Sequence, residues 1–240
     1  DPLDSVDSTD LKRFYEEAAF LQRLDHPNIV SYYDYGLYNE ERPYIAMQHI
    51  EGKPLSKVNF KDMELGDVIH FGRQVLQGLE YIHSNNIIHR DIKPSNLLID
   101  QFQKLYISDF GISKDITSSE SLTQTGTAVG TPEYMSPEQC EGNDISGATD
   151  IYSTGILFYE MLTGKPPFTG QKPMAVAYKQ VHDTPKSIAE LRPDIAESFQ
   201  KFVLKALEKE PKKRFKNATE MLSALKIIET EIEPPTIEDE

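Results

Sequence analysis

The sequence His89-Arg90-Asp91-Ile92-Lys93-Pro94-Ser95-Asn96 places a carboxylate, a cation and an amide at short spacing, and the other elements of the chain can be arranged around it. It follows a segment with apolar residues at helical spacing, which ends near 83–86, and it precedes a short apolar run at 97–99. A second cluster, Asp109-Phe110-Gly111, comes directly after the next short run, 105–107. The pattern therefore predicts a helix, a polar loop and a hairpin that ends in an acidic cluster.

The residue types in these two clusters suit metal-assisted phosphoryl transfer. Asp91 can accept the hydrogen bond of a substrate hydroxyl and take its proton, while Lys93 can place positive charge beside the transferring group. Asn96 and Asp109 offer hard oxygen atoms of the kind that Mg²⁺ prefers, with waters and phosphate oxygens completing the shell. Each residue alone is more often an ordinary loop-capping group, but all four in this order favour a catalytic site.

The pattern H-R-D-x-x-x-x-N, followed at hairpin distance by D-F-G, resembles the catalytic and metal-binding loops of eukaryotic-type serine/threonine protein kinases. The stretch from Gly130 to Phe168, including the run from Lys165 to Gly170, is closest in pattern to the bacterial members of that family. The resemblance implies an α+β, bilobal, protein-kinase-like fold with ATP and Mg²⁺, or Mn²⁺ in its place, as cofactors. It also implies transfer of the ATP γ-phosphate to Ser or Thr hydroxyls of protein substrates.

The resemblance divides the chain into three parts. Residues 1–50 would be a remnant of the N-terminal lobe, residues 51–228 a mainly helical C-terminal lobe, and residues 229–240 an acidic tail or the start of a linker. Periodicity and turn residues predict a helix over 10–24, strands over 29–37 and 43–50, a hinge between the lobes at 51–54, and a buried helix over 151–162.

The resemblance also implies where a nucleotide would bind. Glu17, on the predicted first helix, would be the glutamate that pairs with a strand lysine, although Glu16 beside it is a competing choice for that role. Lys93, Asn96 and Asp109 would face the phosphates. The other implied positions are Met47 behind the adenine, the backbone groups of Gln48 and Ile50 at its edge, and Leu98 beneath it.

Further residues match the scaffold of the family. Glu138 would form a buried ion pair with Arg214, and Asp150 would hold the backbone of the catalytic loop. Thr123 and Thr125 look like activation-loop threonines and are candidate sites of self-phosphorylation.

Two motifs of the family are absent from these residues. Neither a glycine-rich G-x-G-x-x-G-x-V nor a V-A-I-K motif precedes Glu17, and Lys12 lies on the same predicted helix. We therefore expect either a fragment or a natural variant, with weak nucleotide binding and little activity. We also expect an exposed apolar face on the remnant of the first lobe.

Composition excludes several other classes of protein. The net charge of −14 resides mostly in the acidic ends, so no basic surface for nucleic acid is indicated. No apolar run has membrane-spanning length, so no membrane contact is expected. The single Cys140 fits a reducing, cytoplasmic setting.

Two alternatives share the same ancestry. A catalytically silent, pseudokinase-like binding module is disfavoured because Asp91, Asn96 and Asp109 are all present. A small-molecule phosphotransferase is disfavoured because Gly130–Glu138 resembles a segment that positions a peptide substrate.

Overall fold

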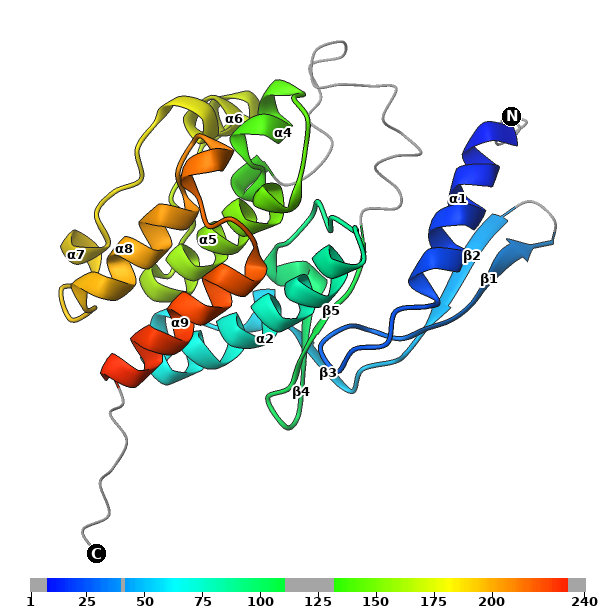
Figure 1. Ribbon diagram of the computed structural model, residues 1–240, viewed down its shortest axis with the longest axis horizontal. Coiled ribbons are helices and arrows are strands. Elements are labelled where there is room, and N and C mark those ends of the chain that lie inside the picture. The colour runs from blue at the N-terminus through cyan, green and yellow to red at the C-terminus, as the bar shows by residue number, and fades with distance from the viewer. Residues whose placement is uncertain (1–7, 40–41, 111–131, 233–240) are drawn as a thin grey trace, which may run out of the picture.

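The computed structural model describes residues 8–39, 42–110 and 132–232. One helix and a two-stranded sheet stand beside a larger, mostly helical body, so the expected α+β fold is confirmed (Figure 1). The smaller part consists of α1 (Ser8–Leu21), β1 (Tyr32–Tyr38) and β2 (Arg42–Met47).

Helix α1 begins at Ser8, two residues before the predicted helix over 10–24, and ends at Leu21, three residues before the predicted end. After Leu21 the backbone tightens, because the N–H of Arg23 bonds to the carbonyl of Phe20 at 3.1 Å and the N–H of Leu24 bonds to that of Leu21 at 3.0 Å. Such bonds to the third preceding residue are typical of a terminating helix, so the apolar spacing continues past the end of α1.

Strands β1 and β2 form an antiparallel hairpin whose bounds differ from the predicted 29–37 and 43–50. The residues just before β1 pair with β5 (Leu105–Ile107) instead: the N–H of Val30 bonds to the carbonyl of Ile107 at 3.0 Å. A backbone group that is already paired there cannot join the hairpin ladder, which explains why β1 begins only at Tyr32.

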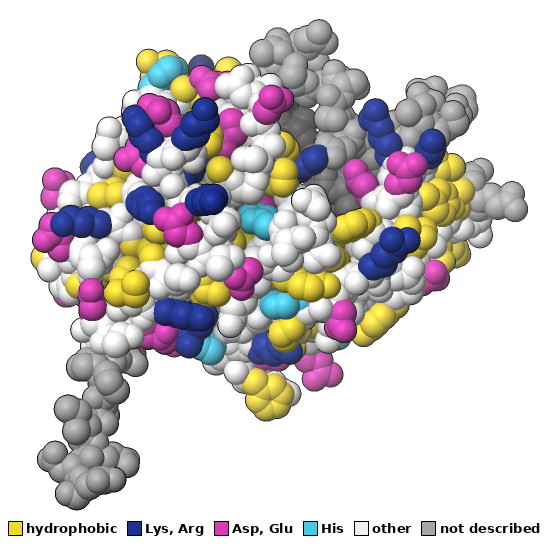
Figure 2. Space-filling model, viewed as in Figure 1, with side chains coloured by type: hydrophobic (Ala, Val, Ile, Leu, Met, Phe, Trp, Pro, Cys, Tyr) yellow, Lys and Arg dark blue, Asp and Glu magenta, His cyan; other side chains and the backbone are white. Residues whose placement is uncertain are grey.

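Aromatic side chains are exposed on the smaller part, as expected from the sequence. Tyr33 and Tyr38 of β1 are 60% and 64% exposed. Tyr44 of β2, with Tyr15 and Phe20 of α1, is also exposed, and Figure 2 shows apolar side chains gathered over these elements. This contiguous apolar surface is unusual for a solvent-facing sheet.

The segment predicted to be the hinge, 51–54, contains a strand in the structure. Strand β3 (Gly52–Pro54) pairs antiparallel with β4 (Leu97–Asp100), and β4 pairs with β5. A Cβ atom on Gly52 would lie 1.9 Å from the carbonyl oxygen of Ile99. Gly52 therefore allows β3 and β4 to approach closely. From sequence alone, a glycine with this role looks the same as a glycine in a flexible linker.

The larger body is built around α2 (Leu65–Ser84) and α5 (Gly147–Thr163), which pack on each other, and α9 (Ala218–Ile232) covers α2. The buried helix expected over 151–162 is confirmed as the centre of α5. Gly164, with φ 80°, ends it. The remaining elements are η1 (Leu55–Lys57), η2 (Phe60–Asp62), η3 (Pro94–Asn96), η4 (Pro132–Tyr134), α4 (Pro137–Glu141), α6 (Pro173–His182), α7 (Ile188–Leu191), α8 (Glu197–Ala206) and η5 (Pro211–Lys213).

Among the residues that the structure describes, no helix combines the length and the apolar composition needed to cross a bilayer.

Candidate active site

The loop over 89–96 is held from the buried helix α5, as the sequence predicted. Asp150 is fully buried, and its Oδ1 accepts the backbone N–H of Arg90 at 2.9 Å. Its Oδ2 accepts the N–H of His89 and the ring Nε2–H of His83, both at 2.8 Å. Arg90 has φ 67°, which is costly for a residue with a side chain, so these charge-assisted bonds stabilise a strained turn.

Within this loop the structure brings together three of the predicted site residues. The side-chain amide of Asn96 donates to the carbonyl oxygen of Asp91 at 2.9 Å and to its Oδ2 at 3.0 Å. The Nζ of Lys93 lies 2.9 Å from the same Oδ2. The Asp91 and Lys93 side chains are 16% and 17% exposed, so an oriented carboxylate and its cation remain accessible at one surface.

Asp109 joins this group through Ser108, which precedes it. The N–H and hydroxyl of Ser108 donate to the Asn96 carbonyl at 2.9 and 3.1 Å, and the hydroxyl also lies 3.1 Å from Asp109 Oδ2. Asp109 is exposed and has φ 55°. The described residues contain no group of three or more His, Cys, Asp or Glu side chains that could hold a metal ion. The donor set therefore fits Mg²⁺ that is shared with phosphate oxygens better than an all-protein metal site.

Three aromatic rings in contact connect β1 with the loop over 89–96. Phe110 lies against His89 with ring centroids 4.7 Å apart and against Tyr32 at 6.1 Å. His89 donates from Nε2 to the Ser108 carbonyl at 3.0 Å and accepts the N–H of Asp91 at Nδ1 at 3.3 Å. Burial lowers the pKa of His89, although the nearby Asp150 carboxylate opposes this, so the ring is a neutral spacer. Sequence analysis missed Tyr32.

The predicted adenine-binding positions lie at the end of β2 and in β4. Met47 is the last residue of β2 and is 45% exposed. The N–H of Gln48 donates a hydrogen bond to the Ser31 carbonyl at 2.8 Å. Within the described chain, no backbone hydrogen bond engages the Gln48 carbonyl or the N–H of Ile50, so both are available to a ligand. Leu98 lies in β4, half-buried.

Glu17 lies on α1 with a half-buried side chain. Its competitor Glu16 is solvated instead, with a side chain that is 67% exposed and 3.8 Å from Lys12 on the same helix. Lys12 therefore lies on the exposed face of α1, the same helix as Glu17, as predicted.

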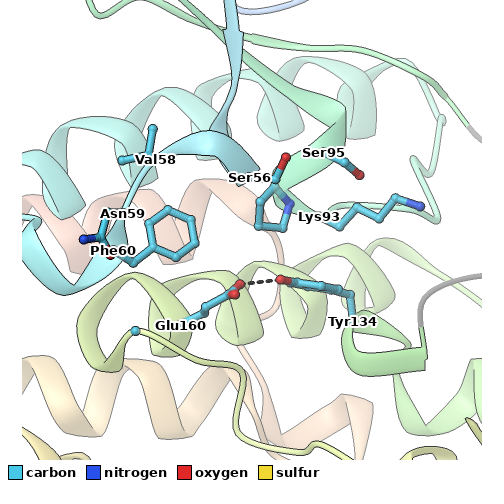
Figure 3. A pocket seen from close by; sticks show the side chains of 10 residues that line it. Ser56, Val58, Asn59, Phe60, Lys93, Ser95, Tyr134 and Glu160 are labelled. Atoms are coloured by element: carbon cyan, nitrogen blue, oxygen red, sulfur yellow. Dashed lines mark hydrogen bonds between the residues drawn. The ribbon is translucent and has the colours of Figure 1, made fainter.

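A pocket of about 360 Å³ opens beside Lys93. Figure 3 shows Ser95 and Tyr134 on its wall, and the hydroxyl of Tyr134 donates to the carboxylate of Glu160 on α5. Burial raises the pKa of Glu160, while the Tyr134 bond opposes this. No Lys, Arg or His among the described residues forms an ion pair with Glu160. Sequence analysis missed this pocket, because its wall comes from four separate segments.

The protein kinase domain family matches residues 2–225 of the chain. The chain belongs to this family. Serine/threonine-protein kinase PknB of Mycobacterium leprae is 38% identical over 218 residues, which cover 89% of this chain and 35% of PknB. A probable serine/threonine-protein kinase of Streptomyces coelicolor is 38% identical over 225 residues, which cover 87% of the chain and 32% of that protein. The chain thus spans about a third of the length of these curated relatives.

The scaffold of the kinase domain includes the predicted ion pair between α4 and Arg214, the residue that follows η5. Arg214 donates from Nη1 and Nη2 to the two carboxylate oxygens of Glu138, both at 2.8 Å, and the pair is buried. This expectation is confirmed. The candidate phosphorylation sites Thr123 and Thr125 lie outside the described residues.

Proposed function

We propose that this kinase domain transfers the γ-phosphate of ATP to Ser or Thr hydroxyls of proteins. The observation that carries the proposal is the convergence of Asp91, Lys93 and Asn96, with Asp109 tied to the same loop through Ser108. The names of the relatives, serine/threonine-protein kinases, support the choice of acceptor.

Asp91 is the proposed catalytic base. Its Oδ2 is held by the Asn96 amide and by Lys93, so the carboxylate is already oriented to accept the hydrogen bond of a substrate hydroxyl and then its proton. Lys93, at 2.9 Å from that carboxylate, can turn its charge towards the transferring phosphoryl group. Fixing both groups before the substrate arrives lowers the cost of orienting them during reaction.

Asn96 and Asp109 would hold Mg²⁺, or Mn²⁺ in its place. When bound, this ion neutralises charge on the triphosphate of ATP and leaves the protein to orient the acceptor. The nucleotide itself would contact Glu17, Met47, Gln48, Ile50 and Leu98, together with Lys93.

The protein substrate would lie over the pocket beside Lys93. Lys93 lines the same pocket, but the Glu160 carboxylate has only the neutral donor Tyr134 and no ion-pair partner among the described residues, so a Lys or Arg side chain of the substrate would complement it. Self-phosphorylation at Thr123 and Thr125 belongs to the same proposal.

Radiolabelled ATP, Mg²⁺ and myelin basic protein, incubated with the chain, test this function. We expect phosphate transfer that falls by about 10²–10⁴-fold in Asp91→Asn with nucleotide binding retained. Asp109→Asn should weaken Mg²⁺-dependent nucleotide binding itself. Asp144→Asn, at an exposed carboxylate, is the matched control. Mg²⁺–ATP binding without any transfer by the wild-type chain would instead identify a silent binding module.

A further inference from the structure

Three successive backbone carbonyls of η4 are each held by a side chain from the helical body. The side-chain amide of Gln180, on α6, donates to the carbonyl of Pro132 at 3.1 Å and to that of Glu133 at 2.7 Å. The hydroxyl of Ser153, on α5, donates to the carbonyl of Tyr134 at 2.8 Å. Gln180 is fully buried, so water does not compete for these bonds.

The orientation of the Gln180 amide is set from its other side. The hydroxyl of Tyr152 donates to Gln180 Oε1 at 2.7 Å, which leaves Nε2 to face the two carbonyls. Lys209 donates to the Tyr152 oxygen at 3.2 Å and to the backbone carbonyl of Gln180 at 2.6 Å. The ammonium group of Lys209 also lies 4.2 Å from the centre of the Phe168 ring. Donors therefore run in one direction, from Lys209 through Tyr152 and Gln180 to η4.

The held turn contributes directly to the pocket beside the catalytic loop. Tyr134, the last residue of η4, lines that pocket and bonds to Glu160. Its carbonyl and the two before it are fixed from beneath, so the position of its ring follows from the same buried bonds.

We propose that Gln180, oriented by Tyr152 and Lys209, is a positioning residue that places η4 to receive the protein substrate. This inference rests on the proposed function, since it takes the pocket beside Lys93 as the place where the substrate lies. Among the described residues, the side-chain amide of Gln180 donates to η4 and not to the catalytic loop, so its loss acts on the protein substrate rather than on ATP.

Gln180→Met tests the role of the amide, because methionine keeps the length of the side chain and removes both donors. Gln200→Met is the matched control: Gln200, on α8, also holds a backbone carbonyl, that of Ile195 at 2.7 Å, but away from η4. We expect the KM for myelin basic protein to rise about tenfold in Gln180→Met, with the KM for ATP and kcat within about twofold of wild type. Gln200→Met should leave all three unchanged.

Amide hydrogen exchange over residues 132–139 provides a second readout, and we expect it to speed up in Gln180→Met alone. Tyr152→Phe keeps the ring and removes the hydroxyl, so it should raise the KM for the protein in the same direction even if Gln180→Met fails to fold. A protein KM that stays within twofold of wild type in both variants overturns the inference. If wild type transfers no phosphate, the proposed function is refuted but this inference can still be tested. The Kd for fluorescent myelin basic protein then replaces KM, and a Kd within twofold of wild type in both variants overturns the inference.

Discussion

Replacing Glu138 by Gln should cost a large part of the stability of this fold, because it leaves a buried guanidinium without its counter-charge. The Arg214 side chain is 0% exposed, and all five of its N–H groups are used. Two bond to the Glu138 carboxylate at 2.8 Å, and the others bond to the carbonyls of Ala148, Glu208 and Lys209 at 2.8, 2.7 and 3.0 Å. The cation therefore cannot turn to water when the carboxylate is lost.

The magnitude follows from what remains around Arg214. Breaking a buried ion pair by removing one partner typically costs about 3–5 kcal/mol. Three carbonyls still solvate the guanidinium in Glu138→Gln, so we expect the lower end, about 3 kcal/mol, against a total of about 5–15 kcal/mol. With a urea dependence of about 3 kcal/mol per molar for a chain of this size, the unfolding midpoint should fall by about 1 M.

Urea unfolding followed by far-UV circular dichroism measures this change, since the chain has no tryptophan. Glu141→Gln is the control, because Glu141 belongs to the same helix, α4, and is exposed. Burial raises the pKa of Glu138, but the hydrogen bonds and charge of Arg214 outweigh this and hold it below 4.5. The stabilisation is therefore complete above pH 4.5 and lost as pH falls through the lower folded pKa, so wild type and variant should converge in acid.

A midpoint for Glu138→Gln that matches Glu141→Gln would refute this reasoning. A difference from wild type that widens as the pH falls would contradict the sign of the pKa shift.

Four further outcomes are expected. Asp150→Asn places an amide donor against a backbone N–H, so the free energy of unfolding measured in urea should fall by about 1–3 kcal/mol. Phosphate transfer should fall as well. Gly72→Ala would put a Cβ 2.1 Å from the Phe158 ring. Such overpacking typically destabilises a fold by about 1–3 kcal/mol, so the melting temperature of this variant should be lower than that of wild type. Burial lowers the pKa of Lys209 from 10.5 to about 8. Between pH 8 and pH 10.5 the unfolded chain therefore binds more protons than the folded chain, and stability rises with pH. The melting temperature of wild type, relative to that of Lys209→Met, should rise from about pH 8 to about pH 10. Glu160→Gln should weaken any preference for Lys or Arg in a phosphorylated peptide library, and an unchanged preference would exclude Glu160 from substrate binding.

The sequence was informative where its motifs match the kinase family. That resemblance implied that Asp150 holds the catalytic loop and that Glu138 pairs with Arg214, and both contacts are present. The buried helix α5 followed from a run that is apolar on all sides. The roles proposed for Glu17, Met47, Gln48, Ile50 and Leu98 remain predictions.

Other features depend on tertiary contacts that leave no local signal. Glu160 and Tyr134 are 26 residues apart and meet only because α5 passes beneath η4. Gln180 and Pro132 are 48 residues apart, and nothing near either residue in the chain indicates the other. Strand β3 is three residues long, too short for alternation to distinguish it from a linker. Helix α1 ends early although its apolar spacing continues.

The pairing of Val30 with Ile107 has a mechanical consequence. Ile107 is the last residue of β5 and lies two residues before Asp109, and its N–H also bonds to the carbonyl of Asn28 at 2.8 Å. The hairpin of the smaller part is thus tethered to the segment that presents this carboxylate. A displacement of this hairpin is therefore transmitted through these backbone hydrogen bonds to Ile107, and from there to the Asp109 carboxylate two residues further along the chain.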